Sequence, residues 1–150
     1  MRRFKSGLLH CGVVTCIFCK IAAGEIPSER VAENAHAFAF LDIDPLVRGH
    51  VLVVPKRHVD RFGDMLPDEA AAVTELTQRV ARRQAKALDS AGATIAVNDG
   101  RAAGQEVPHV HVHVVPRVEG DGFGPIHALF RDRPKFREGE LREIGAMLRG

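Results

Sequence analysis

The chain has 150 residues, the size of one compact domain, so a second catalytic domain is excluded. Hydrophobic residues make up 45% and charged residues 27%, a globular composition that excludes wholesale disorder and repetitive architectures. The net charge of +2 is too balanced for a protein that binds polymeric nucleic acid, although it allows a small anionic substrate. No apolar run approaches the ~20 residues of a membrane span, so we expect a soluble protein with no membrane partner.

Residues 1–15 are predicted to be a disordered extension, and residues 16–150 a single domain with a C-terminal tail from about 125. His10 and Cys11 interrupt the apolar stretch near the start and no good cleavage site follows, which argues against a secretory signal. Cys16 and Cys19 form a C-x-x-C pair, typical of a metal half-site or a redox pair. We therefore expect a cytoplasmic location.

Short apolar runs and turn residues predict hairpin strands over 30–41, broken near Glu33 and Asn34, and a central strand over 49–55 ended by Pro55. A 3.6-residue apolar period, with Pro67 in the first turn, predicts a long helix over 64–89, ended by Gly92.

Further strands are predicted over 94–98 and 109–115, the second closed by Pro116, with a glycine-rich loop over 99–105 between them. Leu141, Ile144 and Leu148 indicate a short C-terminal amphipathic helix. Hairpin strands with few helices indicate the α+β class.

The most informative stretch is the last strand, where three histidines alternate with valines. Alternate strand residues share a face, so His109, His111 and His113 should point to one side and the valines into the core. Clustered imidazoles can supply a nucleophile, a proton donor or metal ligands. Two other readings are solvated polar positions on a half-buried strand and a three-histidine zinc site, which would make the protein a metalloenzyme.

The heptad H-V-H-V-H-V-V resembles the H-x-H-x-H-x-x signature of the histidine triad (HIT) family, and further segments resemble family landmarks in the right order over roughly residues 16–124. These segments are F-L-D-I, G-H-V-L-V-V-P-K-R-H, V-N-D-G and A-G-Q-E-V-P. The chain is similar to the bacterial Hint-like branch with an N-terminal C-x-x-C. The resemblance implies an antiparallel sheet of about five strands, one long helix and a homodimer through which the sheet continues.

The same resemblance implies two-step covalent catalysis at the α-phosphate of a nucleotide. The triad is His109, His111 and His113: His111 would be the nucleophile and His113 would donate to the phosphate. Asn98 would orient the phosphate, and amides in the loop of Gly104, Gln105 and Val107 would bind its oxygens.

Other matched positions concern the nucleoside. Asp42 would accept hydrogen bonds from the ribose hydroxyls, or serve only as a turn residue before Pro45. Ile43, with Phe40 and Leu52, would pack around the base or simply belong to the core. His50 would fix the tautomer of a catalytic imidazole or be an ordinary hydrogen-bonded strand histidine. Glu106 departs from the small hydroxyl residue of many relatives, and the chain contains no tryptophan, so the leaving group is not specified.

In bacterial relatives that carry the C-x-x-C pair, two histidines complete a tetrahedral zinc site. By this resemblance the structural zinc ligands are Cys16, Cys19, His58 and His109. The alternative is a cysteine pair without metal, as a redox couple or as buried thiols.

We therefore predict a nucleotide hydrolase, with a purine nucleotide or nucleoside phosphoramidate as substrate. The alternatives are cleavage of dinucleoside polyphosphates and a nucleotide-binding regulatory module with little catalysis.

Overall fold

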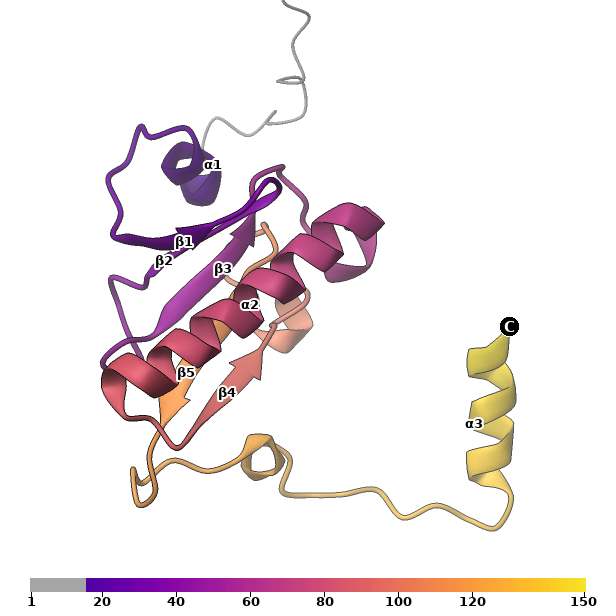
Figure 1. The fold of residues 1–150 in the computed structure, drawn as a ribbon. Helices are drawn as coiled ribbons and strands as arrows, with labels where there is room; N and C mark the ends of the chain where they lie inside the picture. Colours follow the sequence, from indigo (N-terminus) through magenta and orange to yellow (C-terminus); the bar gives the residue numbers. More distant parts are fainter. Residues whose placement is uncertain (1–15) are drawn as a thin grey trace, which may run out of the picture.

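The computed structural model describes residues 16–150; the extension predicted for residues 1–15 lies outside the described residues. A five-stranded antiparallel sheet forms the centre of the molecule, with strand order β1-β2-β3-β5-β4 (Figure 1). The strands are β1 (Arg30–Glu33), β2 (Ala37–Leu41), β3 (Val51–Pro55), β4 (Gly92–Ala96) and β5 (Val112–Arg117). The α+β class and the five-stranded sheet are confirmed.

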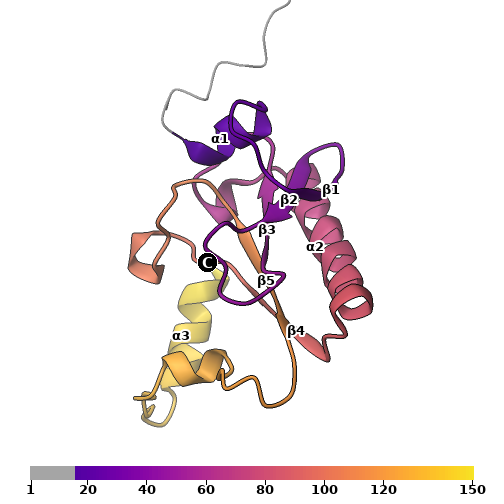
Figure 2. The ribbon, with the colours of Figure 1, turned by 90° about the vertical axis from the view of Figure 1, so that its left-hand side faces the viewer.

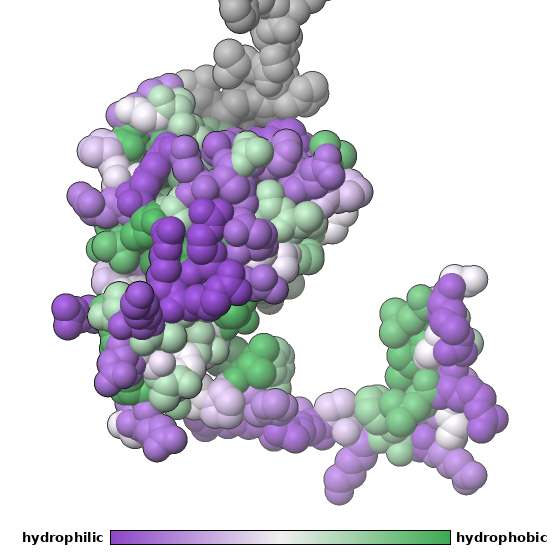
Figure 3. Space-filling model, viewed as in Figure 1, coloured by the Kyte–Doolittle hydropathy of each residue, from purple (hydrophilic) through white to green (hydrophobic). Residues whose placement is uncertain are grey.

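The long helix α2 (Pro67–Leu88) covers one face of this sheet (Figures 1 and 2). Its buried residues Val73, Leu76 and Val80 pack against small and β-branched residues of the central strands. Pro67 suits the first turn, where a missing N–H costs nothing, and the Glu69 carboxylate accepts a 2.9 Å hydrogen bond from the Leu66 amide. The outward face of α2 is hydrophilic, as the purple surface in Figure 3 shows.

The short helix α1 (Ile17–Ala22) packs on the opposite face of the sheet. Phe18 and Ile21 are buried there against alternate residues of β2 and β3, namely Phe38, Phe40, Leu52 and Val54. The sheet is therefore covered on both sides, which explains why β2 and β3 are apolar throughout. This second face carries the candidate site.

Strand boundaries near the triad differ from the prediction. β5 begins at Val112 rather than His109, because β3 pairs only with Val112–Val114, and the Val110 amide instead donates to the Val59 carbonyl at 2.8 Å. Pro116 lies inside β5 and is paired with Ala93 of β4. It lies beyond the last residue paired with β3, so its missing N–H removes no hydrogen bond between β5 and β3. Gly92 starts β4, and α2 ends earlier, at a left-handed Asp89 with φ 52°.

Two short 3-10 helices lie between the strands, η1 (Phe62–Asp64) and η2 (Arg101–Ala103). Beyond β5 the chain leaves the sheet and forms a third, η3 (Ile126–Leu129). The predicted C-terminal helix is present as α3 (Glu140–Arg149), which stands apart from the sheet (Figure 1). One side of α3 is apolar and the other hydrophilic (Figure 3), and Leu141 and Leu148 are exposed. Among residues 16–150 no helix is long and apolar enough to cross a membrane.

Candidate active site and metal centre

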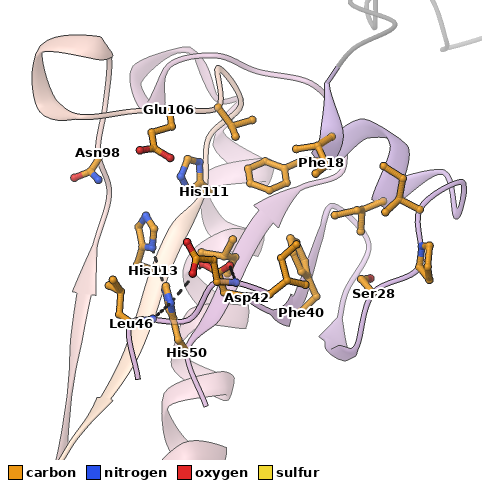
Figure 4. A pocket seen from close by; sticks show the side chains of 18 of the residues that line it. Phe18, Ser28, Phe40, Asp42, Leu46, His50, Asn98, Glu106, His111 and His113 are labelled. Carbon is orange, nitrogen blue, oxygen red and sulfur yellow. Dashed lines mark hydrogen bonds and ion pairs between the residues drawn. The ribbon is translucent and has the colours of Figure 1, made fainter. Parts of the chain in front are cut away.

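A cavity of about 470 Å³ opens on the sheet face that carries α1. It falls within the ~300–1,000 Å³ range of small-molecule sites. Figure 4 shows Asp42, His50, Asn98, His111 and His113 around it; His113 lies in β5, and the other four lie in the loops that flank the strands. The lining includes eight of the predicted substrate and catalytic residues: Asp42, Ile43, His50, Asn98, Gly104, Val107, His111 and His113.

The geometry around His111 assigns its tautomer. Its Nδ1 lies 2.8 Å from the backbone carbonyl oxygen of His109, and a carbonyl only accepts, so Nδ1 carries the proton. Nε2 therefore keeps its lone pair. The ring is 7% exposed and packs edge-on against Phe18, with ring centroids 5.1 Å apart. His111 is thus a fixed imidazole with one nucleophilic nitrogen at the cavity.

A chain of hydrogen bonds likewise fixes His113. The Leu46 amide donates to His50 Nδ1 at 3.2 Å, so His50 carries its proton on Nε2. That Nε2 donates to His113 Nδ1 at 3.0 Å, which leaves the His113 proton on Nε2. His113 Nε2 is buried and has no partner among the described residues. It is therefore a donor available to a ligand in the cavity.

Burial keeps these two rings neutral. Desolvation, with the nearby His111 and His50, lowers the pKa of His113 to about 4. Burial also lowers the pKa of His50, although Asp42 opposes this from 3.4 Å. Because His50 Nδ1 accepts from Leu46, the Asp42 carboxylate keeps acceptor capacity for a ligand; one of its oxygens also accepts from the Asp44 amide at 3.0 Å. Ile43 is 91% exposed at the cavity rim.

The loop from Gly100 to Gly104 borders the cavity, and both glycines have φ 88°, a conformation that favours glycine. Gln105 does not line this cavity. Its side chain accepts from the Gly100 amide at 2.7 Å and donates to the Asp60 carbonyl at 2.9 Å, so it ties the loop to residue 60. Glu106 lies close to His111 in Figure 4 and is exposed.

Four side chains form a second cluster, which shares His109 with the triad: Cys16, Cys19, His58 and His109. Their ligand atoms all lie within 4.8 Å of one another. Cys16 Sγ is 3.3 Å from His109 Nδ1, and Cys19 Sγ is 3.3 Å from His58 Nδ1 and 3.7 Å from His109 Nδ1. Ligand atoms around a tetrahedral zinc lie about 3.4–3.8 Å apart, given its ordinary bond lengths. The cluster can hold such a metal.

The outer contacts of both histidines fit the same ion. His109 Nε2 donates to the Pro55 carbonyl at 2.9 Å, and His58 Nε2 donates to the Asp60 carboxylate at 2.6 Å. Each ring therefore turns the Nδ1 lone pair toward the cysteines, as oriented metal ligands do. Burial, with nearby His58, lowers the pKa of His109 to about 4, which keeps the ring neutral. In the described residues the triad histidines do not form a metal-binding group by themselves.

Two contributors were missed by sequence reasoning. Phe18 touches both clusters, through ring contacts with His109 and His111, and the surrounding α1 segment lines the cavity. Its only signal was its position between the two cysteines. Asp60 orients His58 and anchors Gln105, and its proximity to His58 in sequence was the available signal.

Comparisons with known proteins agree with this geometry. The family model of the HIT domain matches residues 23–120. An uncharacterised HIT-like protein of Methanocaldococcus jannaschii is 50% identical over 107 residues, covering 71% of this chain and 82% of that protein. The adenosine 5'-monophosphoramidase of Schizosaccharomyces pombe is 39% identical over 104 residues, covering 69% and 75%.

A solved structure adds a metal to the comparison. The zinc-bound histidine triad family protein of Mycobacterium smegmatis is 41% identical, with a TM-score of 0.70 over 81% of this chain and 84% of that one. The sheet, the H-x-H-x-H segment beside its cavity and these matches agree, and the chain belongs to the histidine triad family.

Proposed function

We propose that this protein is a nucleotide hydrolase that acts at the α-phosphate through a covalent intermediate on His111, with purine nucleoside phosphoramidates as its substrates. The observation that carries the proposal is the fixed tautomer of His111, whose Nε2 lone pair lies beside a nucleotide-sized cavity. The similar protein of Schizosaccharomyces pombe is named an adenosine 5'-monophosphoramidase, which supports this reaction class.

The nucleoside would lie between α1 and the β2–β3 turn. Asp42 would accept hydrogen bonds from the ribose hydroxyls, since its carboxylate is an acceptor at the cavity wall. Phe40 and Leu52 line the same wall and, with the exposed Ile43, would contact the base.

In the first step His111 Nε2 attacks phosphorus and forms a new P–N bond, the P–N bond to the leaving group breaks, and the amine leaves with a proton taken from solvent. In the second step water attacks phosphorus, the P–N bond to His111 breaks, one proton of the water passes to solvent, and the nucleoside monophosphate is released. His113 Nε2–H would donate to a phosphoryl oxygen throughout, because it is the unpartnered donor in the cavity. Asn98 and the amides of Glu106 and Val107 would hold the other oxygens, since the Gly104 and Gln105 amides donate to the Arg101 and Gly100 carbonyls.

The Cys16, Cys19, His58 and His109 cluster would hold a structural zinc ion that joins α1 to the triad segment. Two thiolates and two neutral imidazoles are a common zinc ligand set, and four protein ligands leave no position for substrate. Such thiols require a reducing compartment, in keeping with a cytoplasmic protein.

We further propose a homodimer that continues the sheet through β4. This strand is one of the two sheet edges, and Ile95 on it is 53% exposed. Unpaired edges favour strand addition. Sedimentation of the full chain would test this directly, and a monomer at micromolar concentration would contradict it.

Steady-state turnover of a fluorogenic adenosine phosphoramidate tests the reaction. We expect His111→Ala to lower kcat at least about 10³-fold, more than 4 kcal/mol of barrier, while the exposed His36→Ala leaves it unchanged. Wild-type turnover that survives His111→Ala would reject covalent catalysis at this residue. Faster cleavage of diadenosine polyphosphates would favour that alternative, and nucleotide binding without turnover would favour a regulatory module.

A further inference from the structure

A second cavity, of about 660 Å³, adjoins the candidate active site. It is lined by Asp60, Arg61, Gly100, Arg101, Gln105, Glu106 and Pro108. Glu106 lines both cavities, so the second begins where the first ends, on the side of Asn98 and the glycine loop. A group leaving the α-phosphate toward this side would enter it.

The walls of this second cavity are held in place. Gln105 joins Gly100 to Asp60, and the Asp99 carboxylate accepts from the Phe62 amide at 2.9 Å. The Arg61 guanidinium lies against Gly100, where a Cβ would come within 1.8 Å of its Nη1. Gly100 is buried with φ 88°, so the backbone there both adopts a glycine conformation and accommodates the arginine.

The charges of the second cavity favour an anion beside its two arginines, Arg61 and Arg101. The Arg61 and Arg101 side chains have no hydrogen bond or ion pair to any other residue in the part of the chain that the structure describes. Of the two acidic residues, Asp60 is paired with His58, which leaves Glu106 at the boundary with the first cavity. Guanidinium groups bind carboxylate and phosphate through paired N–H donors.

We propose that Arg61 and Arg101 form an anion subsite for the leaving group, so that the preferred substrates carry a carboxylate or phosphate beyond the bond that is cleaved. This inference rests on the proposed function, because it gives the leaving group of that reaction its chemical class. Glu106 separates this charge from the α-phosphate, whose binding residues lie in the first cavity.

The test compares matched adenosine 5'-phosphoramidates with the full chain. One pair releases β-alanine or its uncharged amide, and a second pair releases phosphoethanolamine or ethanolamine. We expect wild-type kcat/KM to favour the anionic member about five- to tenfold, and less in high salt. The pair with the larger ratio identifies carboxylate or phosphate as the ligand. In Arg61→Gln/Arg101→Gln both ratios should approach one.

Arg82→Gln/Lys86→Gln is the control, since it removes the same charge from the exposed face of α2 and should retain the preference. The subsite would be rejected if the wild-type ratio of kcat/KM for the anionic over the neutral member were near one. It would also be rejected if that ratio were unchanged in Arg61→Gln/Arg101→Gln. Absence of turnover for all four compounds would instead contradict the proposed function. In that case the dissociation constants of the anionic and neutral members of each pair test the subsite. Tighter binding of the anionic member supports it, and equal binding of the two members rejects it.

Discussion

His111 donates from Nδ1 to the carbonyl oxygen of His109 at 2.8 Å, while the His109 ring joins the cysteine cluster. The backbone of one metal-site residue therefore orients the imidazole proposed as nucleophile. His109 is buried with 0% exposure, and its Nε2 is held by the Pro55 carbonyl. Order in the metal cluster thus bears directly on the orientation of His111.

This coupling predicts an effect of Asp60, which does not line the candidate active-site cavity. Asp60→Ala removes the acceptor of His58 Nε2–H, so zinc affinity should fall about 10- to 100-fold. Competition with a chelating dye measures the affinity. We expect kcat to fall as zinc is lost, and Asp64→Ala, in the exposed η1, to behave as wild type. Unchanged zinc affinity in Asp60→Ala would show that His58 needs no such support.

Phe18 provides a prediction about packing. It is 6% exposed and contacts Phe40, His109 and His111. Phe18→Ala should lower the free energy of unfolding by about 3–5 kcal/mol. The space left by the phenyl ring would stay empty, because the neighbouring rings of Phe40, His109 and His111 are fixed by other contacts. Urea unfolding measures this, with the half-exposed Phe62→Ala as the control. A loss below about 1 kcal/mol would mean that α1 contributes little to the core.

Much of the fold could be predicted because its signals are local. Apolar period and Pro67 located α2, and alternation placed the three histidines on one side of the chain even though β5 begins only at Val112. What could not be predicted depends on tertiary contacts. The six residues of α1 are too short to show a helical period, and they fold against Phe38 and Phe40.

The candidate site divides in the same way. The resemblance identified the residues that line the cavity and the four that form the metal cluster, because motifs carry them. The tautomers of His111 and His113 depend on the His109 carbonyl and the Leu46 amide, which no side-chain motif encodes. The Gln105 amide was expected to bind the phosphate, but it donates to the Gly100 carbonyl at 3.1 Å, and the Gln105 side chain joins Gly100 to Asp60.

The lowered pKa of His113 predicts how stability changes with pH. The folded protein binds this proton only near pH 4, whereas the unfolded chain binds it near pH 6.5. Between these values the unfolded state holds more protons, so the His113 contribution to the free energy of unfolding falls as the pH drops from 6.5 toward 4. Above pH 6.5 this contribution is constant. Solvent near the ring limits the contribution of His113 to about 1–2 kcal/mol.

His113→Asn isolates that contribution, since it leaves the residues of the metal cluster unchanged. Denaturant unfolding at several pH values should give a shallower decline for the variant by this amount. Parallel curves for the two proteins would mean that His113 takes up a proton as easily when folded as when unfolded.

Residues 136–150 allow a last prediction, about specificity. They include α3, whose apolar residues Leu141, Met147 and Leu148 are exposed, so the sheet and α2 lose little packing without it. We expect deletion of residues 136–150 to shift the thermal midpoint by only about 1–2 °C, as for a change outside the core. The relative kcat/KM values for phosphoramidates with different leaving groups should change by more, because an amphipathic helix whose apolar side is exposed among residues 16–150 can act on a neighbouring copy of the site. Leu141→Ser/Leu148→Ser keeps the helix and removes its apolar side, so it should reproduce the deletion. Identical specificity in all three proteins would leave α3 without a role in substrate choice.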